Sequence, residues 1–157
     1  MKIILHPYPR FVDLIIQFIQ PDHNKSGQVM PKDISTIVSM PDEVKGVLKK
    51  ACYDCHSNNT DYPWYTYVQP IHWFINYHIK SGKDELNFNE FGIYTPRRQQ
   101  NKLRAIESSL KEGTMPLWSY TLIHRNAILS EAEKSLIIDW VQSSKDSLNK
   151  KANSSVH

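Results

Sequence analysis

The sequence has 157 residues, of which 40% are hydrophobic, 22% are charged and 11% are aromatic. This length suits one domain, and the composition excludes a disordered chain, a collagen and a protein with several membrane spans. The formal net charge of +3 comes from basic residues scattered along the chain. Such a weak excess does not predict a nucleic-acid-binding surface.

Residues 1–20 contain an apolar stretch that Asp13 and Gln17 interrupt. It falls short of the roughly 20 apolar residues that a membrane span needs. It is also not typical of a signal peptide, because no uninterrupted apolar region leads to a small-residue cleavage site. We expect either a degenerate membrane anchor or a short docking helix here. Residues 21–39 are rich in turn-forming residues and are expected to form a linker.

Two amphipathic helices are predicted in the first half of a domain that spans residues 40–143. Pro41 suits the first position of a helix that leads to Cys52, and Pro70 opens a second helix that ends near Gly82. Their apolar faces are Val44, Val47, Leu48 and Ala51 in the first helix, and Ile71, Phe74, Ile75, His78 and Ile79 in the second.

Two further helices are predicted in the second half of this domain. Thr95 can cap the third helix and Gly113 can stop it, while Ser130 and Glu133 form a capping box at the start of the last. Residues 144–157 show no apolar stripe, so we expect a disordered tail there. No alternating strand pattern is present, and the sequence therefore predicts an all-α domain. The buried faces are Leu103, Ile106 and Leu110, and then Leu136, Ile137, Trp140 and Val141.

The two cysteines of the chain, Cys52 and Cys55, precede His56 in a Cys-x-x-Cys-His motif. This spacing is typical of covalent haem attachment. Each thiol can add to a haem vinyl group, and the adjacent imidazole is then held beneath the iron as its proximal ligand. The motif therefore predicts one covalently bound haem c.

Three other interpretations of the motif remain open. A disulfide between Cys52 and Cys55 is sterically feasible, although it would close a very small loop and contribute little stability. A zinc site needs four ligands, and with His56 the motif provides three, with no second cysteine pair in the chain. A thioredoxin-like dithiol belongs at a strand-to-helix junction, and the sequence shows no such βαβ pattern.

A second axial ligand would decide the chemistry of a haem iron bound by His56. Met115 is the favoured candidate, because it lies between two predicted helices in a loop that Gly113 frees and Pro116 stiffens. Without haem, a methionine at this position would simply fill an irregular gap. The alternative ligands are His72, His78 and His124, of which His78 falls on a predicted apolar helix face.

Seven aromatic residues lie between Tyr62 and Tyr77, a density that suits either the wall of a flat apolar cofactor or an ordinary aromatic core. Among them and in the Met115 loop, the residues expected to bind the cofactor are Trp64, Tyr65 and Trp118. These three and the arginines Arg97 and Arg98 are the candidate donors to haem propionates.

From about residue 31 to residue 141 the chain resembles the bacterial haem-binding domain family, a set of single-haem c-type proteins. The resemblance implies an all-α, cytochrome-c-like fold around one covalent haem, with thioether links at Cys52 and Cys55, His56 as proximal ligand and Met115 as sixth ligand. Family members commonly start with a membrane anchor, and residues 15–24 are similar to the end of one. The residues that carry the likeness are ACYDCHSNNT at 51–60, YPWY at 62–65, Pro70 with Trp73, LNFNEF at 86–91, MPLWSYTLIH at 115–124, and Leu129-Ser130 with Glu133.

The leading functional hypothesis is one-electron transfer by a c-type cytochrome that is not an enzyme. Its partners would be redox proteins met transiently, in the periplasm or cell envelope of a bacterium, with N-terminal membrane anchoring as an option and no nucleic acid. The alternative is a haem-based sensor or gas-binding protein whose sixth iron position is open or labile. A haem-free thiol–disulfide enzyme is the third class of function that the motif allows.

Overall fold

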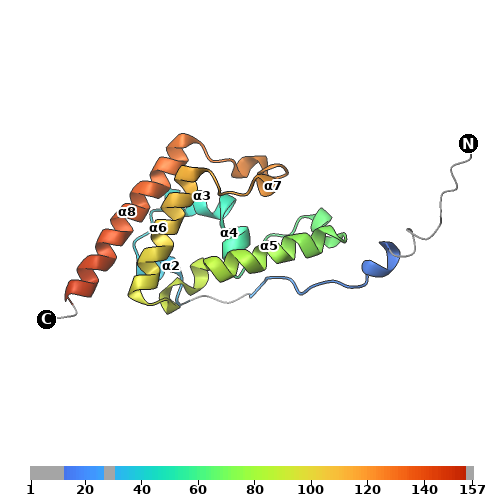
Figure 1. The fold of residues 1–157 in the computed structure, drawn as a ribbon, viewed down its shortest axis with the longest axis horizontal. Helices are drawn as coiled ribbons and strands as arrows, with labels where there is room; N and C mark the ends of the chain where they lie inside the picture. The colour runs from blue at the N-terminus through green and yellow to red at the C-terminus, as the bar shows by residue number, and fades with distance from the viewer. Residues whose placement is uncertain (1–12, 27–30, 155–157) are drawn as a thin grey trace, which may run out of the picture.

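The chain folds into an all-α structure, as predicted. The computed structural model describes residues 13–26 and 31–154, and within these ranges the only β-type pairing is an isolated bridge between Lys25 and Asn59 (Figure 1). The α-helices are α2 (Ile34–Ile37), α3 (Asp42–Ala51), α4 (Tyr53–His56), α5 (Ile71–Glu85), α6 (Pro96–Glu112), α7 (Trp118–Thr121) and α8 (Glu131–Ser154), and the 3-10 helices are η1 (Trp64–Tyr67), η2 (Phe88–Ile93) and η3 (Arg125–Ala127).

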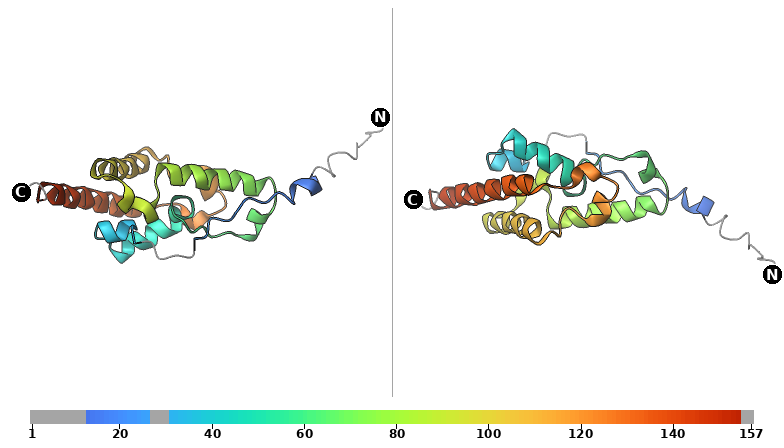
Figure 2. Two further views of the ribbon diagram at one scale, coloured as in Figure 1. Left: turned by 90° about the horizontal axis from the view of Figure 1, so that it is seen from below. Right: turned by 90° about the horizontal axis from the view of Figure 1, so that it is seen from above.

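Helices α6 and α8 lie side by side, and α5 runs from them toward the end of the molecule where the N-terminal segment leaves (Figures 1 and 2). The core between α3, α6 and α8 is apolar because each helix turns its predicted stripe inward. Leu48, Leu103 and Ile137 are fully buried there. The Trp140 indole nitrogen donates a hydrogen bond to the Ser39 carbonyl 2.9 Å away, which satisfies its polar atom inside the core.

The predicted caps of α6 and α8 are confirmed. Thr95 accepts a hydrogen bond from the Arg98 backbone N–H, and Gly113 ends α6 in the left-handed conformation with φ 68°. At the start of α8, Ser130 and Glu133 exchange the hydrogen bonds of a capping box. These local signals work because they satisfy backbone groups that the helix itself leaves unpaired.

The predicted end of α5 is wrong, because the helix passes through Gly82 and ends at Glu85. The start of α3 differs by one residue, since Pro41 lies at the N-cap and Asp42 is the first helical residue. A helical glycine is tolerated at position 82 because another backbone segment passes close to it. That segment belongs to the Cys-x-x-Cys-His turn.

The expected linker at 21–39 contains an ordered piece of the core. Asp33 caps the short helix α2 by accepting a hydrogen bond from the Ser35 backbone N–H. Ile34 and Val38 are buried in the main apolar cluster. Two apolar residues four apart are too short a pattern to predict a helix, so only the tertiary contact reveals it.

The tail predicted to be disordered is wrong for residues 144–154, which continue α8. Ser144 is buried, Leu148 packs against the core, and the Lys151 ammonium donates a hydrogen bond to the Ile37 carbonyl at 2.9 Å. Leu148 is the one large apolar residue from 144 to 154, which is too weak a stripe to predict a helix, but it lies seven residues after Val141 on the same helix face. Residues 155–157 lie outside the described part of the chain.

The N-terminal segment is described from residue 13, where four residues form a single helical turn. Most of the expected anchor, residues 1–12, and residues 27–30 of the expected linker lie outside the described ranges. A search of the described helices finds none that is long and apolar enough to cross a membrane.

Candidate functional site

The Cys-x-x-Cys-His motif forms a tight helical turn directly after α3. Cys52 closes α3 by donating its backbone N–H to the Leu48 carbonyl at 2.8 Å, and it then starts α4 by accepting the His56 backbone N–H at 3.0 Å. The Tyr53 ring stacks on Phe88 with the centroids 4.9 Å apart, which fixes the turn against η2. The first predicted helix therefore delivers the motif as expected.

The imidazole of His56 is held in one orientation by a backbone carbonyl. Its Nδ1 lies 3.0 Å from the Leu86 oxygen, just after α5. A carbonyl can only accept, so Nδ1 carries the proton and the lone pair of Nε2 remains available to bind a metal. Burial lowers the pKa of His56, against the smaller opposing effect of this hydrogen bond, which favours the neutral ring that a metal ligand requires.

His56 and Met115 line the same cavity, although 59 residues separate them in the sequence. The cavity has a volume of about 210 Å³, and Cys52 lies in its wall. Its walls are mainly apolar, which suits a flat apolar cofactor. The apolar lining is Leu48, Ala51, Leu86, Phe88, Ala105, Ile106, Leu110, Pro116 and Ile137.

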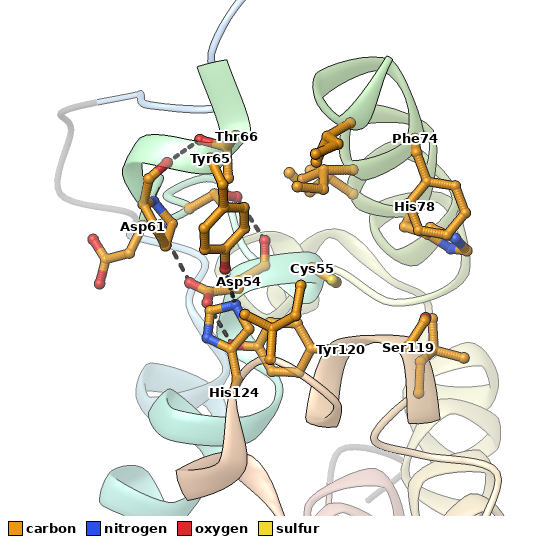
Figure 3. A pocket seen from close by; sticks show the side chains of 17 residues that line it. Asp54, Cys55, Asp61, Tyr65, Thr66, Phe74, His78, Ser119, Tyr120 and His124 are labelled. Carbon is orange, nitrogen blue, oxygen red and sulfur yellow. Dashed lines mark hydrogen bonds between the residues drawn. The ribbon is translucent and has the colours of Figure 1, made fainter. Parts of the chain in front are cut away.

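A second cavity of about 110 Å³ lies on the side of the motif that Cys55 lines (Figure 3). Tyr120 donates a hydrogen bond to the Asp54 carboxylate at 2.6 Å, and the Tyr65 hydroxyl lies 2.6 Å from Nε2 of His124. The loop after α6 separates the two cavities, because its Met115 end lines the larger one and its Tyr120 end lines the smaller one.

Both cysteines are free thiols in this structure. Burial raises the pKa of Cys52 to about 12 and that of Cys55 to about 11, so both are protonated at neutral pH. A dithiol oxidoreductase needs the opposite, a lowered thiol pKa in an electropositive environment. Within the described ranges there is also no group of three or more His, Cys, Asp or Glu side chains that could hold a metal ion by themselves.

Helix α5 approaches the motif closely at Gly82. A Cβ atom at this position would lie 2.7 Å from the Cys55 carbonyl oxygen, closer than real Cβ contacts allow. The approach lets the chain after α5 bring the Leu86 carbonyl to His56. Gly82 is therefore a residue that positions the His56 imidazole, and the sequence offered no reason beyond a helix end to single it out.

The structure does not bring two of the expected cofactor-binding residues to these cavities. Trp64 is 80% exposed and Trp118 is 77% exposed, and neither lines the larger or the smaller cavity. Tyr65 does line the smaller cavity. Of the expected propionate donors, Arg98 instead lies over the Tyr94 ring, with its guanidinium carbon 4.5 Å from the centroid.

The alternative histidine ligands lie apart from His56. His78 and His124 line the smaller cavity. His72 is fully buried elsewhere, with Nδ1 2.6 Å from the Gln20 side-chain oxygen. Of the candidate sixth ligands, Met115 is thus the one that shares a cavity with His56.

Lys102 is a site residue that the sequence analysis missed. It is the single Lys or Arg lining either cavity in the part of the chain that the structure describes. Its side chain is 17% exposed, and its nearest carboxylate is an exposed one, Glu85, at 3.6 Å. A largely buried cation with so distant a partner can accept an anionic group of a ligand. Lys102 shares one face of α6 with three other residues that line the cavity, namely Ala105, Ile106 and Ser109. This helical spacing was the signal in the sequence that could have revealed it.

The residues present therefore fit a haem. A neutral imidazole and a thioether face one apolar cavity, the Cys52 thiol and a cation lie in its wall, and the Cys55 thiol lines the neighbouring smaller cavity. An all-α domain with this site belongs to the haem proteins.

Sequence comparison identifies the family. Residues 11–143 match the model of the haem-binding domain family, and the chain belongs to that family. The resemblance noted from the sequence is thus confirmed. The chain is also 28% identical over 111 residues to cytochrome c peroxidase Ccp of Escherichia coli (strain K12). This match covers 68% of the chain but 24% of the relative, so the chain spans about a quarter of that protein. No solved structure gives a significant match.

Proposed function

We propose that this protein is a c-type cytochrome that carries one covalent haem and transfers single electrons between redox proteins. The observation that carries the proposal is the shared cavity of His56 and Met115, with Cys52 in its wall. Two side chains of the kinds that bind haem iron therefore line one apolar cavity, where one ligand can contact both. An electron carrier needs no substrate site, so we propose no enzymatic activity for the chain.

Cys52 and Cys55 would attach the cofactor. Each sulfur would form a carbon–sulfur bond with one vinyl group, and the thiol hydrogen would pass to the other carbon of that vinyl group, so that no external oxidant is required. Because the two thiols lie in different cavities, a cofactor bonded to both must reach past the loop that begins at Met115.

His56 and Met115 would bind the metal from opposite sides. The Leu86 carbonyl holds the ring of His56 and increases its basicity, while the thioether of Met115 favours the reduced state of the metal. When bound, haem iron supplies the one-electron couple between its ferric and ferrous states. With His56 and Met115 both holding the metal, no coordination site would remain for a substrate.

The remaining residues of the larger cavity would control charge and water. Its apolar wall excludes water from the metal, and this raises the reduction potential. Lys102 would hold a carboxylate of the cofactor, a role for which Trp64 and Trp118 are too exposed.

The proposed partners are other redox proteins, bound briefly through small surfaces. We place the protein in the periplasm or cell envelope, since family members carry haem attached outside the cytoplasm. The weak net charge gives no support to nucleic acid as a partner.

Spectroscopy and mass analysis of protein matured with a haem-attachment system test the proposal. We expect c-type bands in the reduced-minus-oxidised spectrum and a polypeptide mass increased by one haem. Met115→Ala should lower the midpoint potential and change the spectrum, because it removes a ligand that favours ferrous iron. Met40→Ala is the matched control, since Met40 packs against the core and lines neither cavity. An unchanged spectrum and potential in Met115→Ala would contradict the ligand assignment.

One observation favours a haem-based sensor as a second candidate. Met115 is 37% exposed and lies in a loop, so its bond to the metal could be labile. Carbon monoxide separates the two functions. Fast binding by the reduced parent protein would support the sensor, whereas resistance in the parent and binding in Met115→Ala would support the electron carrier.

A further inference from the structure

The N-terminal segment leaves the molecule beside η1 and the start of α5 (Figures 1 and 2). These elements expose a group of large apolar side chains. Phe18 is 88% exposed, Trp64 is 80% exposed and Tyr77 is 67% exposed. We call the surface formed by the N-terminal segment, η1 and the first turns of α5 the aromatic end. It also exposes Ile19, Val68 and Trp73. A soluble domain rarely leaves such a contiguous apolar surface without a partner.

Charged residues are missing from the two stretches that carry the exposed apolar residues of the aromatic end, and Asp13 and Asp22 border the N-terminal one of these stretches. From Tyr62 to Ile79 and from Leu14 to Pro21 the chain has no Asp, Glu, Lys or Arg. A typical protein interface has a polar rim with charged residues around its apolar centre. Exposed Trp and Tyr together with aliphatic residues and no charge are instead typical of surfaces that lie at the boundary of a lipid bilayer.

A network of amide hydrogen bonds fixes the N-terminal segment to η1 and α5. The Gln69 backbone N–H donates to the Gln17 side-chain oxygen at 2.9 Å, and the Gln17 amide donates back to the Gln69 carbonyl at 3.2 Å. The Trp73 indole nitrogen donates to the Ile19 carbonyl at 3.1 Å. The two exposed apolar regions are therefore held together as one surface and do not move independently.

We propose that the aromatic end rests in the interface of a lipid bilayer and holds the domain upright on the membrane. The occupant is a bilayer rather than a second copy of the chain, because the sequence that directly precedes this surface, residues 1–12, supplies seven further apolar residues. That sequence and the aromatic end together enlarge the apolar area that can enter the interface. Phe18, Trp64 and Tyr77 line neither cavity, so a contact through these side chains leaves both cavities free.

Vesicle binding by the haem-loaded full chain tests this contact. Phosphatidylcholine vesicles are used because they carry no net charge, so that added carboxylates act only where they touch the bilayer. The test variant is Val68→Glu with Tyr77→Glu, which leaves the N-terminal segment intact. The matched control is Ile93→Glu with Ile128→Glu, two exposed apolar residues outside the aromatic end.

We expect the parent protein to sediment with the vesicles and the test variant to bind at least about tenfold more weakly, since two exposed side chains can no longer be buried. The control should bind within about twofold of the parent, because a tenfold loss needs about 1.4 kcal/mol and its residues touch no lipid. Equal binding by the test variant would overturn the proposal and leave the N-terminal segment as the sole contact. Absence of vesicle binding by the parent protein would also overturn the proposal. If the parent protein formed a dimer in sedimentation velocity and the test variant did not, the surface would instead bind a second copy of the chain. The haem spectrum of each variant reports separately on the proposed electron carrier.

Discussion

Two glycines inside helices provide a matched test of how closely α5 packs on the Cys-x-x-Cys-His motif. Gly82 lies in α5 and Gly46 in α3. A Cβ atom at Gly82 would lie 2.7 Å from the Cys55 carbonyl oxygen, whereas one at Gly46 would meet no atom within 4 Å. Gly82→Ala therefore forces an overlap with backbone that Gly46→Ala avoids.

The two substitutions are expected to change stability in opposite directions. Alanine inside a helix is more favourable than glycine by about 0.5–1 kcal/mol, so Gly46→Ala should raise the free energy of unfolding by that amount. An extra methyl group in a filled contact costs about 1–3 kcal/mol. The overlapping atom at Gly82 is backbone, which cannot rotate away, so we expect Gly82→Ala to lower the free energy of unfolding by about 1–2 kcal/mol.

Urea unfolding followed by far-ultraviolet circular dichroism measures both variants and the parent at equal haem loading. With a slope of about 2 kcal/mol per molar urea, the two midpoints should differ by about 1 M. Gly82→Ala should also reduce the yield of attached haem, because the shift of the turn moves Cys55. If both variants were stabilised alike, α5 would not approach Cys55 as described, and the hydrogen bond from His56 to Leu86 would lose its support.

Three further predictions concern charge and thiol chemistry. Hydrogen bonds from Lys111 and Lys145 lower the pKa of Glu107 to about 2. The ionised Glu107 carboxylate therefore contributes its full stabilisation above the ordinary pKa of a glutamate, and this stabilisation is lost as the pH falls through about 2. Glu107→Gln should therefore lower the free energy of unfolding by about 1 kcal/mol at pH 7, with the difference from the parent vanishing near pH 2 in urea titrations. Lys102→Gln should lower the midpoint potential in a redox titration by on the order of tens of millivolts, because it removes a positive charge that favours the reduced metal. A raised midpoint potential would contradict the placement of Lys102 in the cavity wall. Thiol-labelling reagents should leave the two cysteines unmodified in the unfolded haem-loaded protein, and labelling of both would exclude thioether links.

The sequence predicted those features that depend only on residues close together in the chain. Thr95, Gly113 and the pair of Ser130 with Glu133 mark helix ends because they satisfy backbone groups within three or four residues. The Cys-x-x-Cys-His motif likewise predicted its cofactor class. Fold class and family followed from the same signals.

Contacts between distant segments were decided by the tertiary structure. The carbonyl that orients His56 comes from Leu86, thirty residues later, and a backbone carbonyl has no signature in the sequence. Lys102 enters the cavity only because α6 has a second inward face, and Leu148 orders the last turns of α8 by reaching a core built mainly from earlier residues. Periodicity reports which residues share a helix face, but the surface that covers this face depends on how the whole chain packs.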